Sequence, residues 1–115
     1  MKFQKPIKIK ELINDGVIKS VYICDENTDI LSGFATDLLS HGIDKAQKGD
    51  AWLTILTNHN IMAPASISEV SCLILCDNTQ PTEMLIKRAE MMNINLLKTE
   101  LSIFDTAVYL SKYKG

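Results

Sequence analysis

Hydrophobic residues in this chain fall into short continuous runs that are separated by amphipathic segments and polar turns. Runs at residues 17–24, 51–56 and 72–76 are rich in β-branched or large apolar residues and predict buried strands. The run at 72–76 is apolar throughout, a pattern typical of a strand covered on both faces. Two weaker strands are predicted at 30–36 and 94–97.

Apolar residues spaced three and four apart predict helices in the first half of the chain. The first is expected at residues 7–15, where Gly16 ends it. The next is expected to be capped by Asp37 and to continue through Leu38, Leu39 and Ile43.

Three more helices are predicted in the second half. Asn60 is expected to cap a helix that runs to about Ser68, and Thr82 to cap one that ends at Asn93. Residues 102–105 match a capping box ahead of a final helix. The residues expected to face the core are Leu85, Ile86, Ala89 and Met92 of the Thr82 helix, and Phe104, Ala107, Val108 and Tyr113 of the last one.

Strands that alternate with helices predict a three-layer α/β domain with a mainly parallel or mixed sheet. The chain has 115 residues and no linker-like segment, so we expect one domain over residues 1–115. Lysines gather near both ends of the sequence. They indicate either a docking surface or solvated, partly frayed ends.

Composition narrows the possible partners. The net charge of -2 argues against nucleic acid or an anionic membrane as the ligand. Arg88 is the only arginine, which excludes a phosphate clamp built from several arginines. No signal peptide or membrane span is visible, and the three cysteines show no Cys-x-x-Cys spacing, so we expect a cytoplasmic protein with reduced thiols. Cys24, Cys72 and Cys76 are all expected to lie in the core.

Polar residues follow four of the five predicted strands, at residues 25–28, 57–60, 77–79 and 99–102. In open α/β sheets, ligands bind outside the carboxyl ends of the strands. These segments therefore predict a pocket for a small polar ligand, although polar turns and helix caps also follow strands in proteins without a ligand there.

Catalytic chemistry has weaker support. His59 is the best candidate for acid–base work, but a loop histidine that caps a helix or is solvated is the simpler interpretation. We expect His41 to follow a short helix as a favourable charge at its C-terminus. Asp25, Glu26 and Asp29 carry the ligand type that a hard cation prefers, but an exposed acidic turn is the simpler interpretation. The glycines do not cluster into a phosphate-binding loop. No metal or cofactor is predicted.

Four blocks of sequence, at residues 33–40, 49–54, 57–65 and 99–104, resemble the stand-alone DRTGG-domain proteins. The resemblance covers about residues 8–113. It implies an α/β fold similar to the N-terminal domain of HPr kinase/phosphorylase, and to accessory domains of phosphotransacetylases and of pyrophosphatases that carry CBS domains. It further implies a non-catalytic regulatory role and a homodimer.

The chain departs from that family in two ways. The pentapeptide that names the domain is absent, and Thr57-Asn58-His59-Asn60 stands where relatives often read Thr-His-x-Asn. The resemblance is to a non-kinase domain, so it implies no kinase activity.

Three functional hypotheses follow. The first is a regulatory module that senses a small polar metabolite or adenine nucleotide. The second is an interaction subunit that docks on a kinase-like or hydrogenase-associated partner without a small ligand. The third is an enzyme in which His59 acts as general base, assisted by Asp77 or Glu100. The residues predicted to line a ligand site are Asp50, Thr57, His59, Asn60, Asp77 and Thr99.

Overall fold

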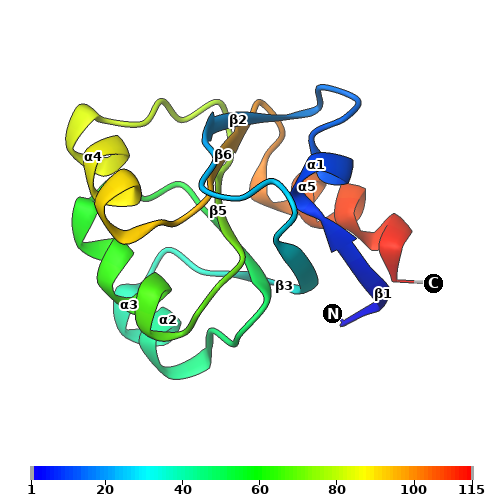
Figure 1. Ribbon diagram of the computed structural model, residues 1–115, viewed down its shortest axis with the longest axis horizontal. Coiled ribbons are helices and arrows are strands. Elements are labelled where there is room, and N and C mark those ends of the chain that lie inside the picture. Colours follow the sequence, from blue (N-terminus) through cyan, green and yellow to red (C-terminus); the bar gives the residue numbers. More distant parts are fainter. Residues whose placement is uncertain (1, 115) are drawn as a thin grey trace.

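Six strands form one mixed sheet in the order β1-β3-β4-β5-β6-β2 (Figure 1). The computed structural model describes residues 2–114. Strands β3, β4, β5 and β6 run parallel to one another, whereas the outer strands β1 and β2 are antiparallel to their neighbours. The strands are β1 (Lys2–Lys8), β2 (Ile18–Tyr22), β3 (Asp29–Ala35), β4 (Asp50–Thr54), β5 (Cys72–Leu75) and β6 (Leu96–Thr99).

Helices cover both faces of this sheet (Figure 1). One face is covered by α2, α3 and α4, and the other by α1 and α5. The helices are α1 (Ile9–Leu12), α2 (Leu39–Lys45), α3 (Met62–Ile67), α4 (Glu83–Met92) and α5 (Ile103–Leu110). Two 3₁₀ turns, η1 (His59–Ile61) and η2 (Ser111–Tyr113), precede α3 and follow α5.

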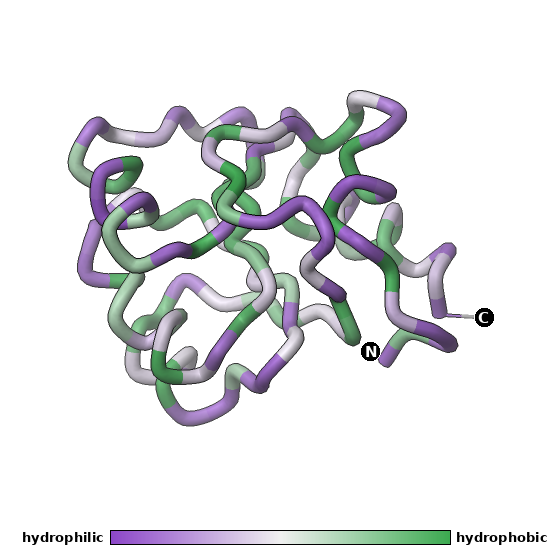
Figure 2. The backbone as a smooth tube through the Cα atoms, in the orientation of Figure 1, coloured by the Kyte–Doolittle hydropathy of each residue, from purple (hydrophilic) through white to green (hydrophobic). Residues whose placement is uncertain are grey.

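Each face of the sheet has its own hydrophobic core. Alternate residues of β5 divide between the two cores: Ile74 packs toward α1 and α5, and Leu73 and Leu75 pack toward α3 and α4. Figure 2 shows the hydrophobic colour along the central strands and the hydrophilic colour in many of the connecting loops. A strand buried on both faces has no solvent side to carry polar residues, which explains the continuous apolar run.

The structure confirms the predicted fold class, an α/β domain with three layers and a mixed sheet. None of the helices within residues 2–114 is long and apolar enough to cross a membrane.

The N-terminal prediction was wrong. Residues 2–8 form an edge strand instead of a frayed end, and the helix predicted at 7–15 is limited to Ile9–Leu12. Phe3 and Ile7 of β1 are buried, so this lysine-rich segment has an apolar face that covers the core.

Two predicted helix caps were also wrong. Leu38, not Asp37, occupies the N-cap position of α2, and the Asp37 carboxylate instead accepts hydrogen bonds from the Thr54 hydroxyl at 2.7 Å and the Ile55 N–H at 2.9 Å. The cap near residue 60 lies two residues earlier, because the Asn58 side chain accepts from the Asn60 N–H.

The final helix is rotated relative to the prediction. Ser102 caps α5 as expected, but Phe104 is 76% exposed and Val108 is 54% exposed. Thr106 and Leu110 are buried in their place. Thr106 satisfies its hydroxyl by donating to the Ser102 carbonyl at 2.6 Å, which allows a polar residue to face the core.

Two single residues also differ from expectation. Cys24 is exposed, whereas Cys72 and Cys76 are buried as predicted. His41 lies inside α2 instead of after a helix, and its ring stacks on Phe34 with centroids 5.6 Å apart.

Candidate functional site

The carboxyl ends of β5 and β6 meet at one edge of the sheet, where two connecting segments are tied together by backbone hydrogen bonds. The Asp77 N–H donates to the Leu101 carbonyl at 2.6 Å, and the Asn78 N–H donates to the Thr99 carbonyl at 3.0 Å. Asp77 and Asn78 both have φ near +60°, at 60° and 55°. Asp and Asn tolerate this left-handed conformation better than most residues, which explains their presence at this turn.

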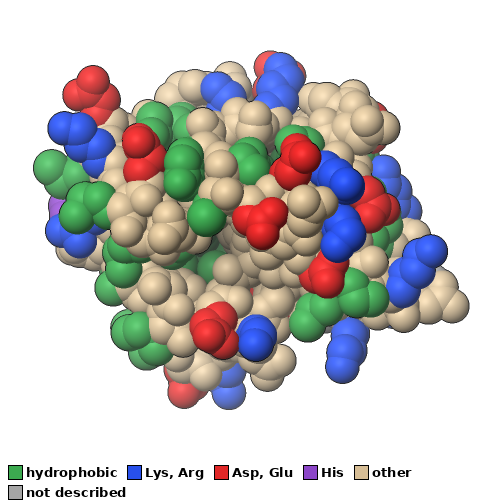
Figure 3. Space-filling view, viewed as in Figure 1, with side chains coloured by type: hydrophobic (Ala, Val, Ile, Leu, Met, Phe, Trp, Pro, Cys, Tyr) green, Lys and Arg blue, Asp and Glu red, His purple; other side chains and the backbone are tan. Residues whose placement is uncertain are grey.

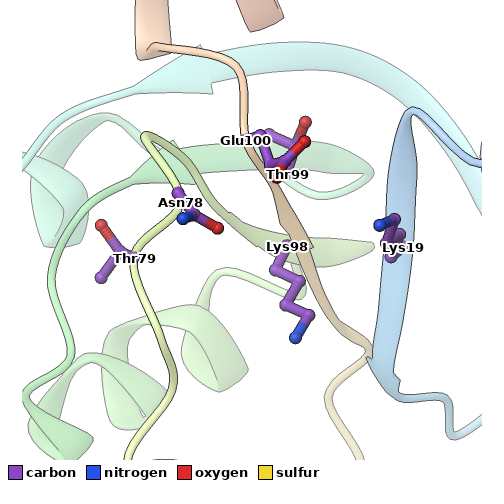
Figure 4. A pocket seen from close by; sticks show the side chains of 6 residues that line it. All are labelled: Lys19, Asn78, Thr79, Lys98, Thr99 and Glu100. Atoms are coloured by element: carbon purple, nitrogen blue, oxygen red, sulfur yellow. The ribbon is translucent and has the colours of Figure 1, made fainter.

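A small pocket of about 110 Å³ lies between this turn, the end of β6 and the edge strand β2 (Figure 4). Every side chain that lines it is polar or charged. The lining residues are Lys19, Asn78, Thr79, Lys98, Thr99 and Glu100.

Lys19 and Lys98 are the cationic residues of the pocket, and they are direct cross-strand partners in the antiparallel pairing of β2 with β6. Residues that lie opposite each other in this way project from the same face of the sheet. Within residues 2–114, neither ammonium group makes an ion pair with a carboxylate. Lys19 is exposed and Lys98 is half-buried.

The Thr99 hydroxyl is already hydrogen-bonded within the protein, so Thr99 holds the wall of the pocket in place. Its hydroxyl donates to the Val17 carbonyl at 2.8 Å and accepts from the Leu101 N–H at 3.3 Å. These bonds join the start of β2 to the segment after β6. Asn78 is fixed from the other side, because the Gln80 side-chain amide donates to the Asn78 carbonyl at 3.1 Å.

The structure separates the six residues predicted to line a ligand site into three groups. Thr99 lines the pocket, and Asp77 directly precedes Asn78 in the turn that forms its wall. Thr57, His59 and Asn60 lie on the segment after β4, at the same edge of the sheet, and do not line this pocket.

Asp50 lies at the amino end of β4, which is the opposite edge of the sheet. It is buried, and its carboxylate accepts hydrogen bonds from the Ser32 hydroxyl and, at 2.8 Å, from the Gln47 N–H. These contacts connect β3 to the turn before β4. Asp50 also lines a separate pocket of about 310 Å³ at that edge, together with Lys45 and Lys48.

The two buried cysteines, at the start of β5 and just after it, are poor nucleophiles and poor metal ligands. Burial raises the pKa of the Cys76 thiol, at the end of β5, and raises that of Cys72 more strongly. Both side chains are therefore thiols at neutral pH, whereas nucleophilic attack and metal binding require the thiolate. Across residues 2–114, no three His, Cys, Asp or Glu side chains come together in a group that would hold a metal ion.

Sequence reasoning missed both lysines of the pocket. Each stands as a lone charge in an otherwise largely apolar strand, Val17-Ile18-Lys19 and Leu96-Leu97-Lys98. That signal was available. What the sequence did not supply is the pairing of β2 with β6, which brings together residues nearly eighty positions apart.

Comparison with known proteins adds a structural relative. No family model matches the chain, and no curated protein matches it by sequence. A solved structure, that of the CBS and DRTGG domains of the regulatory region of Clostridium perfringens pyrophosphatase in complex with its activator diadenosine tetraphosphate, superposes with a TM-score of 0.75 at 18% identity. The similarity supports a DRTGG-like fold.

The superposition covers 93% of this chain and 46% of the neighbour, so the chain spans about half the length of that regulatory region. At this level of identity the likeness carries the fold. The nucleotide activator belongs to the larger protein.

Proposed function

We propose that this chain is a non-catalytic regulatory module that binds a small polar metabolite or an adenine nucleotide at the carboxyl edge of its sheet. The observation that carries the proposal is the pocket between β2, β6 and the turn after β5. All six of its lining residues are polar or charged, and its two lysines form no ion pair with a carboxylate within residues 2–114. Ligands of open α/β sheets bind at this edge.

The DRTGG-like fold agrees with a regulatory role. The structural neighbour is a regulatory region, and its activator is an adenine dinucleotide. Of the residues considered for catalysis, Glu100 follows β6 and lines the pocket, whereas His59 follows β4 and does not line it. General acid–base catalysis requires both groups within hydrogen-bond reach of a shared substrate position.

A thermal-shift screen tests this function. The purified protein is melted with adenine and guanine nucleotides, dinucleoside polyphosphates, acyl phosphates and divalent ions. A ligand at one hundred times its Kd stabilises the folded state by about 2.7 kcal/mol. In a domain of this size that raises Tm by roughly 10 °C or more. A flat screen across all classes contradicts ligand sensing.

Two variants refine the screen. Asn78→Ala removes a pocket side chain, and Thr57→Ala alters the segment after β4, at the same edge but outside the pocket. We expect the first to reduce the ligand-induced shift and the second to preserve it. If Thr57→Ala reduces the ligand-induced shift and Asn78→Ala preserves it, the ligand binds at the segment that contains Thr57, His59 and Asn60.

A second candidate function is an interaction subunit, favoured by apolar side chains on the outer surface of the helices. Ile67 at the end of α3 is 81% exposed and Met91 of α4 is 75% exposed, and Leu38, Ile43 and Met84 are also exposed on that side. Figure 3 shows hydrophobic side chains along the side of the molecule where α2, α3 and α4 lie. Exposed apolar patches mark protein-binding surfaces. Two results together would favour this function: no ligand in the screen shifts Tm, and a protein partner binds the wild type but not Met91→Lys.

The resemblance to DRTGG-domain proteins also supports one domain over residues 1–115 and a homodimer as proposals. Light scattering after size-exclusion chromatography distinguishes a dimer from the 12.9 kDa monomer.

A further inference from the structure

We propose that the pocket at the end of β6 is a receptor for a phosphoryl group, with Lys19 and Lys98 as the two residues that bind its oxygens. This inference rests on the proposed function and names the chemistry of the ligand. The group that we expect to bind is a terminal phosphate, carried either by a nucleotide or by an inorganic polyphosphate.

The two lysines are unfavourably paired in the absence of a ligand. Like charges directly opposite each other in an antiparallel pair are destabilising. Lys19 and Lys98 occupy such positions at one end of the β2–β6 ladder, and Lys98 is half-buried, which weakens the screening of its charge by water. A bound dianion between the two ammonium groups converts this repulsion into attraction.

Neutral hydrogen-bonding groups line the pocket beside the lysines. Asn78 contributes an amide from the turn that faces the end of β6, and Thr79 of the same turn also lines the pocket (Figure 4). Glu100 also lines the pocket, so the formal charge of the pocket, with two lysines and one glutamate, is +1. The donors of a phosphate site are therefore present without any arginine, since lysine binds phosphate as a point charge.

The size of the pocket limits which part of a ligand it can hold. Sites that enclose a whole drug-sized ligand measure about 300–1,000 Å³. The pocket, at about 110 Å³, is too small for a complete nucleotide. It suits one phosphoryl group, and the remainder of the ligand then lies outside, over the turn after β5.

The test compares three probes on four proteins by isothermal titration calorimetry. The probes are ADP, inorganic tripolyphosphate and adenosine. The proteins are the wild type, Lys19→Glu, Lys98→Glu and the control Lys5→Glu. Lys5 is an exposed lysine on β1, which is the outermost strand on the side of the sheet opposite to β2. The control therefore makes the same change of charge on the other outermost strand.

We expect the wild type and Lys5→Glu to bind ADP and tripolyphosphate alike, and adenosine to bind more weakly than ADP. We expect Lys19→Glu and Lys98→Glu to weaken both phosphorylated probes by about tenfold or more, the loss typical of a charge-assisted hydrogen bond. Equal weakening by Lys5→Glu would show a general charge effect and overturn the inference.

The outcomes separate this inference from the proposed function. If ADP binds all four proteins equally, or if adenosine binds as tightly as ADP, the chain is still a ligand-binding module but the lysine pair is not its phosphate receptor. If no probe binds the wild type, and the broader screen is also flat, both are contradicted.

A second readout needs no ligand. Lys19→Glu replaces a like-charged cross-strand pair by an opposite-charged one, so it should raise Tm at low salt by about 2–6 °C, and the gain should shrink at high salt. A variant that gains stability while it loses ADP binding supports a lysine pair retained for binding. An unchanged or lower Tm at low salt would contradict the repulsion on which the inference depends.

Discussion

Gly42 in the middle of α2 offers a sharp test of the packing between α2 and the sheet, because two opposing effects act at this position. In an ordinary exposed helix, Gly→Ala stabilises by about 1 kcal/mol. Here a Cβ built on Gly42 would lie 2.1 Å from Cη2 and 2.4 Å from Cζ2 of the Trp52 indole. These distances are far shorter than any van der Waals contact.

The indole has little freedom to move away. Trp52 is fully buried in the centre of β4, and its ring N–H donates to the Thr36 carbonyl at 3.0 Å. Overpacking a core of this kind costs about 1–3 kcal/mol, and sometimes more. The severe overlap places Gly42→Ala at the upper end of that range, so we expect a net destabilisation of about 1–3 kcal/mol after the gain in helix propensity.

Urea unfolding measures this effect directly, since Trp52 is the only tryptophan and its fluorescence reports on the affected site. Ser40→Ala is the matched control, an exposed position of the same helix where the propensity gain is not opposed by a clash. In a Trp52→Phe background, followed by circular dichroism, the cost of Gly42→Ala should fall because the clashing part of the ring is gone. A Gly42→Ala protein as stable as the wild type would refute the packing described here.

Three further predictions concern stability and reactivity. Asn95→Ala should lower the free energy of unfolding by about 2–4 kcal/mol, measured by urea unfolding. The buried Asn95 side chain accepts from the N–H groups of Cys24 at 2.8 Å and Asp25 at 3.1 Å, and it donates to the Ser71 carbonyl at 2.9 Å. A loss below about 0.5 kcal/mol would contradict this network. A thiol reagent at neutral pH should label Cys24 alone in the native protein and all three cysteines in urea, and rapid labelling of native Cys72 or Cys76 would contradict their burial. The hydrogen bond from Tyr109, together with the N–H of Val17 and the charge of Lys112, holds the pKa of Asp15 below its usual 3.8. The folded state therefore prefers the ionised carboxylate, so its contribution is present at neutral pH and is lost as pH falls below about 4. Asp15→Asn should lower Tm at pH 7 and match the wild type near pH 2, and a constant difference in Tm across that range would argue against the linkage.

Much of the fold was predictable because the strongest signals in this sequence are local. The continuous apolar run of β5 and the Thr82 and Ser102 caps of α4 and α5 were placed correctly, since each depends on residues a few positions apart. The edge strand β1 was missed. Its lysines and its proline obscure an apolar face that only Phe3 and Ile7 reveal, and strand formation there depends on a distant partner, β3.

Helix orientation was less predictable for a physical reason. In α5 the apolar residues occur on more than one face, so periodicity alone does not identify the buried side. The side is decided by the packing of α5 against β3 and β4, which places Thr106 inward and Phe104 outward.

The candidate site was predicted in outline and missed in detail. The rule that ligands bind at the carboxyl ends of parallel strands led to Asp77 and Thr99, which border the pocket. The same rule led to Thr57, which lies on a neighbouring segment of that edge. The lysines could not be paired from sequence, because β2 is antiparallel and joins the sheet beside the last strand.

The most direct test of ligand binding at this pocket is chemical-shift mapping of the ¹⁵N-labelled protein during titration with ADP. If ADP binds in this pocket, the largest amide shifts occur at Lys19, at Asn78 and Thr79, and at residues 98–100, with much smaller shifts elsewhere. Shifts concentrated instead at residues 57–60, or in the opposite-edge pocket that contains Lys45, Lys48 and Asp50, would contradict it.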